Sequence, residues 1–309
     1  MKILFVGGGR RVGLAKAFLE RGIQVVGWEL NPKETPLTTV CPVVQGLGWN
    51  TERLAMQNHL NRVMETWNID FLLPLQDEAI GIVAQSYLPR ICSSIETAQT
   101  CFDKFQFHQF CAEHFWKHLP LKSEGYPRIL KPRFGFGSNG IHKVHTWEEE
   151  DTLREHTAQN TTQLIYRWID GDEYTVDIYR TKDKNIISVS PRLRERVAGG
   201  EVVNSTVVWD EDIAWLAGEV ADKLDIIGPA CVQIIKEKET GHLYLIECNA
   251  RFGGGSVLSI EAGMDMPSMI EAEYSSGPTT FMNSRIFMDR YDNWKPGLKM
   301  RRYFSEVYI

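Results

Sequence analysis

The sequence predicts a mixed α/β protein in which a parallel α/β region is followed by a region richer in hairpins. The chain opens with the apolar run "KILFV", a glycine triplet and an amphipathic stretch, which together are typical of a βαβ unit. A second apolar run, "FLLPL", begins at residue 71. From "RILKP" onward, strand-like runs and hairpin turns become more frequent, as in "CVQII" and "LYLIE". We therefore expect a parallel sheet across roughly residues 1–95 and a domain boundary near residue 98.

The composition is that of an ordinary globular protein. With 309 residues the chain can form a large core divided between subdomains. A net charge of −6 gives no general attraction to nucleic acid or anionic membranes. The N-terminal apolar run is too short for a signal peptide, and no run approaches the roughly 18 apolar residues of a membrane span. We therefore expect a cytoplasmic protein with no nucleic-acid or membrane partner and with reduced cysteines.

The first turn, Gly7–Gly9, lies between an apolar strand and an amphipathic segment. Glycines in that position can cradle a phosphate, as they do in dinucleotide sites. In "GGGRRVG" three residues separate the last two glycines that could match, whereas the GxGxxG fingerprint has two. We therefore expect a tight turn that packs a helix on the sheet rather than an NAD or FAD site.

The segment from Phe102 to His118 is predicted to be helical and carries three histidines and a cysteine. Such residue types can bind zinc, but four ligands from one short helix do not easily form a tetrahedron. Surface histidines and a buried cysteine are the expected reading.

A glycine-rich hairpin follows in "RILKPRFGFGSNG". Lys131 ends an apolar strand, and Gly135, Gly137 and Ser138 come after it. Backbone N–H groups in such a loop can approach phosphate oxygens because no side chain holds the ligand away. The Walker A spacing is absent. An ordinary flexible hairpin is the alternative.

Three arginines alternate further along, in "PRLRERVAGG". On a strand Arg192, Arg194 and Arg196 would share one face, and Arg196 lies closest to the flexible glycines at 199 and 200. A charged edge strand that resists aggregation is the alternative reading.

The last informative stretch is "LYLIECNARFGGGS". Glu247 and Asn249 point to one face of a strand, and a hairpin turn at 239–241 could bring Gln233 beside them. Two amide oxygens and a carboxylate are hard ligands that suit Mg²⁺. Arg251 follows and could hold a phosphate. A solvated strand end with a surface ion pair remains the alternative.

These segments, taken in order, resemble the ATP-grasp enzymes, and among them proteins similar to carbamoyl phosphate synthetase large chains. The motifs that carry the resemblance across the chain are "KILFVGGGRR", "FDKF", "LKPRFGFGSNG", "YRWIDGDEYTVD", "RVAGGE", "CVQII" and "LIECNARFGGG". The resemblance implies a Rossmann-like pre-ATP-grasp domain over 1–98. It also implies an ATP-grasp domain over 99–309 with a small lid subdomain at about 120–165.

The resemblance also implies roles for individual residues. Lys104 and Lys131 match positions that grip ATP phosphates, and Gly135, Gly137 and Ser138 form the loop beside them. The segment from Tyr166 through Trp168 to Ile169 matches the hinge that reads adenine, although a tyrosine stands where the family usually has an acidic residue. The other matched positions are Glu173 for ribose, Gln233, Glu247 and Asn249 for the metal, and Arg196, Arg251 and Lys131 for catalysis.

The chemistry implied is that of an ADP-forming ligase with ATP and Mg²⁺, or Mn²⁺ in its place. The γ-phosphate would activate a small-molecule carboxylate as an acyl phosphate, and an amine would attack it to form an amide bond, releasing phosphate. Cations are needed because two anions must meet. Asp77 and Glu78 are candidates for the acceptor site, although acids also suit a helix N-terminus. A regulatory ATP-binding protein or pseudoenzyme is the alternative, and a homodimer through the first domain would fit the family.

Overall fold

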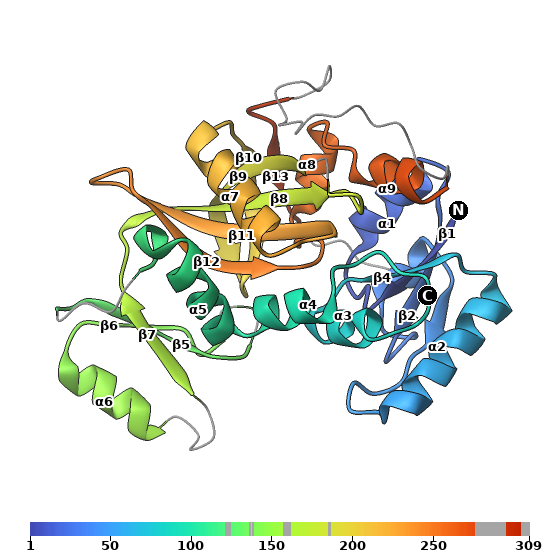
Figure 1. Cartoon of the computed structure of the whole chain (residues 1–309), viewed down its shortest axis with the longest axis horizontal. Coiled ribbons are helices and arrows are strands. Elements are labelled where there is room, and N and C mark those ends of the chain that lie inside the picture. The colour runs from blue at the N-terminus through green and yellow to red at the C-terminus, as the bar shows by residue number, and fades with distance from the viewer. Residues whose placement is uncertain are drawn as a thin grey trace.

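The structure is a computed structural model that describes residues 1–120, 125–135, 137, 139–156, 162–184, 187–275 and 295–303. Its strands form three sheets with helices packed against them (Figure 1). The mixed α/β class predicted from the sequence is confirmed. No helix in the described ranges is both long enough and apolar enough to cross a bilayer.

The first sheet is parallel, as the sequence predicted, and its strand order is β3-β2-β1-β4. Strands β1, β2 and β4 are mostly buried apolar runs, a pattern typical of parallel sheets covered on both faces, whereas the edge strand β3 is only partly buried. The strands are β1 (Lys2–Val6), β2 (Gln24–Glu29), β3 (Val43–Gln45) and β4 (Phe71–Pro74). The helices of this region are α1 (Val12–Leu19), α2 (Arg53–Trp67) and α3 (Asp77–Ala84), with the short 3-10 helix η1 (Pro36–Thr39).

Two helices lead from this sheet toward the rest of the molecule. They are α4 (Ile95–Phe102) and α5 (Lys104–His114), followed by the 3-10 turn η2 (Trp116–His118). Each begins at a capping side chain, since Ser94 accepts from the amide of Thr97 and Asp103 from the amide of Phe105. Both pack against β12. The boundary predicted near residue 98 falls inside α4, and the division into domains stays a prediction.

A small sheet lies at the left of Figure 1, away from the first sheet, with the strand order β6-β5-β7. Its elements are β5 (Arg128–Pro132), β6 (His142–Val144), β7 (Gln163–Arg167) and α6 (Trp147–His156). The buried Glu150 of α6 pairs with Arg128 of β5 at 3.0 Å and accepts from the hydroxyl of Tyr126. This contact fixes the helix to the sheet within the segment that the sequence predicted as a lid.

The third sheet is antiparallel, with the order β12-β11-β8-β9-β10-β13. Helix α7 packs on β8, β9 and β11 and buries the apolar side chains of one face. The strands are β8 (Gly171–Arg180), β9 (Ile187–Ala198), β10 (Glu201–Val207), β11 (Gly228–Glu237), β12 (Leu243–Asn249) and β13 (Lys299–Arg301). The helices are α7 (Glu211–Lys223), α8 (Ser256–Glu261) and α9 (Met266–Ser275).

Candidate active site

The three residues predicted to bind a metal share one face of the β11–β12 hairpin. Gln233 lies directly opposite Glu247 in the register, and Asn249 stands two residues further along β12. Directly opposed residues of antiparallel strands point to the same face. The amide of Asn249 donates to Glu247 Oε1 at 3.2 Å, and all three side chains are half-buried. Two amide groups and a carboxylate therefore meet at this end of the hairpin.

A bulge in β12 brings Lys131 to the same place. The register passes from Gln233–Glu247 to Ile234–Leu245, so Ile246 is an extra residue in the ladder. Lys131, on β5, donates from Nζ to the carbonyl oxygen of Ile246 at 3.2 Å. The buried lysine thus reaches β12 from a different sheet.

Burial lowers the pKa of Lys131 from its ordinary 10.5 to about 8, with Glu247 opposing the shift and Lys104 adding to it. Removal from water disfavours the ammonium form. Lys131 therefore lies within electrostatic range of both Glu247 and Lys104. An anion bound beside it would restore the charged form.

Lys104 begins α5 and is tied to the glycine-rich loop. Its Nζ donates to the carbonyl oxygen of Gly135 at 2.7 Å. The preceding residue, Asp103, holds Arg133 at 2.8 Å, which fixes the start of α5 to the end of β5. His108, also on α5, has its pKa lowered by burial and by the charge of the nearby Lys131.

The glycine-rich loop approaches the turn between β9 and β10 backbone to backbone, at Gly137 and Gly200. A Cβ added to Gly200 would lie 2.2 Å from the Cα of Gly137, so only glycine fits there. Gly135 and Gly137 both have positive φ, at 137° and 68°. Ser138, predicted to bind the nucleotide, lies outside the described residues.

Of the predicted hinge residues, Tyr166 lines a small pocket between α5, β5, β7 and β12, together with Lys104 and Lys131. The ring of Tyr166 is buried under Lys131, with Nζ 4.7 Å from its centroid. Ile169 is buried, and the indole of Trp168 lies 4.1 Å from Nζ of Lys143. The Trp168 amide donates to the carbonyl oxygen of Pro127 at 3.2 Å, so in this structure that amide is already used.

Glu173, predicted to contact ribose, lies on β8 and pairs with Arg194 Nε at 3.1 Å. Burial raises the pKa of Glu173, Arg194 opposes the shift and Glu247 adds to it. Its carboxylate therefore lies near the predicted metal ligands.

The three alternating arginines have different surroundings. Arg192 is 1% exposed and is held at 2.6 Å by Asp177, whose carboxylate also accepts from the hydroxyls of two α8 serines. Arg194 pairs with Glu173. Arg196 is exposed and forms no ion pair or hydrogen bond with the part of the chain that the structure describes. A bulge at Glu195 interrupts the expected alternation. Arg192 thus has a structural role.

Arg251 is engaged with the first region of the chain. It binds the carboxylate of Asp77, at the start of α3, through Nε at 2.8 Å and through Nη2 at 3.1 Å. Nη2 also donates to Asn249 Oδ1 at 3.2 Å. Burial alone would lower the pKa of Arg251, but the pairing with Asp77 raises it above its ordinary value. Arg251 is thus already paired where the sequence predicted a phosphate contact.

Sequence reasoning missed Glu29, at the end of β2. Its carboxylate accepts hydrogen bonds from the backbone amides of Gly8 and Gly9. Burial raises the pKa of Glu29. The amides that would face a dinucleotide phosphate are therefore occupied by a side chain of the protein, which disfavours the NAD reading.

Sequence reasoning also missed Arg11, which precedes α1. A Cβ on Gly254, in the glycine run after β12, would lie 3.4 Å from Arg11 Nη1. These contacts join residues far apart in the chain, and local pattern carries no signal for them.

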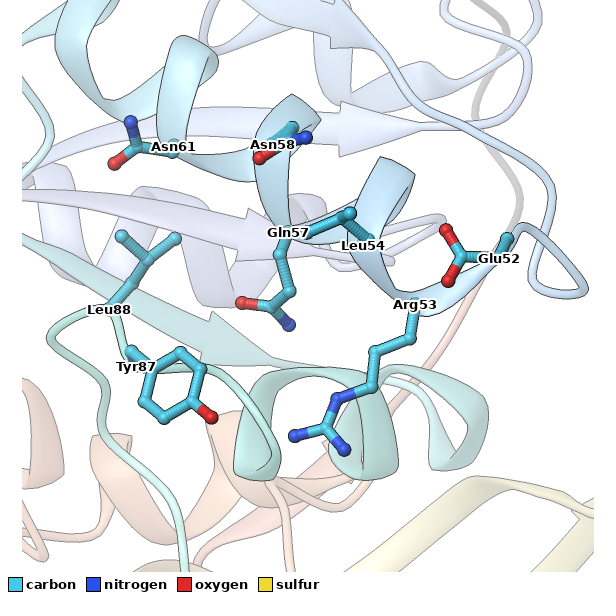
Figure 2. Close-up of a pocket in the computed structure, with 8 residues that line it drawn as sticks. All are labelled: Glu52, Arg53, Leu54, Gln57, Asn58, Asn61, Tyr87 and Leu88. Atoms are coloured by element: carbon cyan, nitrogen blue, oxygen red, sulfur yellow. The ribbon is translucent and has the colours of Figure 1, made fainter.

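A separate groove lies on the outside of the first region, between α2 and the loop at 87–88 (Figure 2). Its volume is about 500 Å³, and its side chains include Arg53, Gln57 and the exposed Tyr87. It contains none of the residues predicted for nucleotide, metal or catalysis.

Comparison with known proteins agrees with this architecture. A family model described as an ATP-grasp domain matches residues 101–255, half of the chain. Among curated protein sequences, none matches this chain.

Solved structures resemble most of the chain. The L-amino acid ligase of Bacillus licheniformis is 18% identical, with a TM-score of 0.67, over 88% of this chain and 74% of its own. The N5-carboxyaminoimidazole synthetase of Staphylococcus aureus, complexed with ADP, is 17% identical, with a TM-score of 0.69, over 90% and 78%. The biotin carboxylase of Campylobacter jejuni is 16% identical, with a TM-score of 0.64, over 90% and 72%. At these identities the likeness shows a shared fold.

Proposed function

The chain belongs to the ATP-grasp family, and on that basis we propose that it is a carboxylate–amine ligase that uses ATP and Mg²⁺. The observation that carries the proposal is the meeting of Gln233, Glu247 and Asn249 on one hairpin face beside Lys131. An acyl phosphate would form first, and attack by an amine would then give the amide with release of phosphate. ADP is the other product.

Lys104 and Lys131 would hold the triphosphate. Both lie beside the pocket lined by Tyr166, and Lys104 already contacts the glycine-rich loop at Gly135. Backbone amides of Gly135 and Gly137 would approach phosphate oxygens, because these positions have no side chain. Adenine would lie against the hinge at Tyr166–Ile169, with Glu173 near the ribose.

The donor set on β11 and β12 fits a hard divalent cation. Oxygen atoms from Gln233, Glu247 and Asn249 suit Mg²⁺ or Mn²⁺ in ligand type, and no sulfur is among them. When bound, the metal would neutralise negative charge on the phosphates. Asn249 donates its amide hydrogen to Glu247, and its oxygen accepts from Arg251, so one lone pair of that oxygen is left for a metal ion.

The acceptor carboxylate must approach the γ-phosphate against charge repulsion. Arg251, fixed by Asp77, would offset that repulsion from one position. Arg196 is exposed and has no ion pair or hydrogen bond within the described residues, and it would contact the γ-phosphate or the carboxylate when the glycine-rich loop lies over them. Exclusion of water by this loop would protect the acyl phosphate from hydrolysis.

A release assay tests the proposal. Carboxylates are screened against amines with Mg²⁺-ATP, ADP and phosphate are measured, and products are identified by mass spectrometry. With a carboxylate and an amine that react, the Glu247→Gln variant should turn over at least 100-fold more slowly than the unmodified protein. Losses of this size are usual when a group that acts on the transition state is removed. Glu261→Gln, which changes an exposed carboxylate at the end of α8, should behave as the unmodified protein. Failure of the protein to bind ATP or ADP by calorimetry would refute the proposal.

A regulatory nucleotide-binding protein is the second candidate. The pairing of Arg251 with Asp77 favours it, because an arginine already neutralised contributes less to charge offset. Tight nucleotide binding without ADP formation for any carboxylate and amine would support it.

The remaining expectations concern location and partners. We propose a cytoplasmic protein that acts on small molecules rather than on nucleic acid or membranes. A homodimer through the first region stays a prediction, and sedimentation equilibrium tests it directly.

A further inference from the structure

Arg11 is a cation without a partner at the junction between the first region and the antiparallel sheet. Its guanidinium forms no ion pair or hydrogen bond with any residue in the described ranges. Its Nη1 lies 3.4 Å from the position that a Cβ on Gly254 would take. The side chain is only partly exposed, so it gives up some hydration without forming an ion pair in return, although the carboxylate of Glu201 lies nearby.

Two further arginines lie close to Arg11, and each of them is paired. Arg251 is bound by Asp77, and Arg302 is held by Glu201 at 2.7 Å. Arg302 also donates to the carbonyl oxygen of Gly254. Two carboxylates therefore face three guanidinium groups, and one positive charge is left over at Arg11.

The surroundings penalise the charge on Arg11. Burial, and then repulsion from Arg251, lower the pKa of Arg11 from 12.5 to about 10, although Glu201 partly opposes this. A side chain kept in such a position without a partner is a liability for the free protein. A bound anion would remove that liability.

Resting on the ligase function proposed above, we propose that Arg11 binds a carboxylate of the acceptor substrate between the Gly7–Arg11 loop and Gly254. The guanidinium fork suits a planar carboxylate, which can accept two parallel hydrogen bonds. The site also lies next to Arg251, which donates to the predicted metal ligand Asn249. A substrate held by Arg11 is thus presented on the side of Arg251 that faces the first region.

The first test measures anion binding with simple probes. The protein is saturated with Mg²⁺-ADP, and malonate or inorganic phosphate is titrated at constant ionic strength while the thermal midpoint is followed. Malonate should raise the midpoint saturably, with an apparent affinity at least tenfold weaker in Arg11→Gln. Arg10→Ala removes the neighbouring exposed arginine of the same loop and should bind malonate as the unmodified protein does.

Two results would overturn the assignment. One is an equal malonate response in Arg11→Gln and the unmodified protein, and the other is tenfold tighter binding of inorganic phosphate than of malonate. Both are distinct from failure of the ligase proposal, which would show as no effect of Mg²⁺-ADP on the unmodified protein.

A second readout separates binding from a structural role. Removing an unpaired, partly buried cation should raise the midpoint of the ligand-free protein by about 1–2 °C in Arg11→Gln. A guanidinium that merely held the loop in place would give a lower midpoint, and that outcome would also overturn the assignment. Arg11→Lys keeps the charge without the fork and should restore only part of the malonate affinity.

Discussion

At the scale of single residues, Lys131 lies between the pocket predicted to hold the nucleotide and the predicted metal ligands. It is buried, contacts the bulged carbonyl of Ile246 and lies near Glu247. Its charged form is disfavoured in the free protein, so its protonation should depend on whether phosphate is bound.

We therefore predict that nucleotide binding takes up protons near pH 8. With a pKa of about 8 in place of 10.5, Lys131 is only partly charged there, and a bound phosphate would raise its pKa again. Uptake of about half a proton should appear in calorimetry as a binding enthalpy that differs between buffers of different ionisation enthalpy. Lys131→Met should lose this difference. Equal enthalpies for the unmodified protein in both buffers would contradict the role.

The same shift predicts how stability changes with pH. A lysine whose pKa is lowered by folding binds fewer protons in the folded state between about pH 8 and 10.5, so its contribution makes the protein more stable as pH rises through that window. The urea midpoint of Lys131→Met, compared with that of the unmodified protein, should be higher at pH 7, and the gap should narrow by pH 10. A gap independent of pH would mean that the substitution acts through packing alone.

At the scale of elements, the glycine-rich loop after β5 and the turn between β9 and β10 meet backbone to backbone. Gly200 and Gly137 allow this approach because neither has a Cβ. The same loop accepts a hydrogen bond from Lys104 at Gly135, a residue predicted to hold the nucleotide.

Gly200→Ala should weaken Mg²⁺-ADP binding about tenfold, because the added Cβ would displace the glycine-rich loop that is expected to cover the ligand. Gly199→Ala is the matched control: its φ of 56° carries a similar backbone cost to the 74° of Gly200, but no atom lies within 4 Å of the added Cβ. Calorimetric titration of both variants separates the clash from backbone strain. Equal affinities would show that the contact is unimportant for binding.

The sequence predicted those parts of the site that depend on local pattern. Alternation along a strand placed Glu247 and Asn249 on one face, and the short turn brought Gln233 opposite Glu247. It could not predict the Ile246 bulge, which requires the partner strand. It also missed the pairing of Glu29 with the Gly8 and Gly9 amides, because packing rather than spacing joins those residues.

At the scale of the whole molecule, two glycine-containing turns follow β-strands, and their surroundings in the structure differ. The turn after β1 has amides bound to Glu29, whereas the loop after β5 lies beside Lys104 and the hinge pocket. The molecule should therefore take a nucleotide at the second turn alone.

Mg²⁺-ATP should stabilise the protein and NAD should not. A ligand at 100 times its dissociation constant adds about 2.7 kcal/mol to the free energy of unfolding, enough for a clear rise in thermal midpoint. Differential scanning fluorimetry with each nucleotide measures this. Stabilisation by NAD alone would place the nucleotide at the first turn and remove the ligase reading.

The pair between Asp77 and Arg251 has a mechanical consequence. Asp77 begins a helix packed beside the parallel sheet, and Arg251 grips Asn249 with the same nitrogen that it offers to Asp77. A displacement of α3 relative to β12 would therefore either break one of these hydrogen bonds or move the Asn249 oxygen that is proposed to bind the metal. Through this single guanidinium group, the position of the first region would affect the geometry of the proposed metal site.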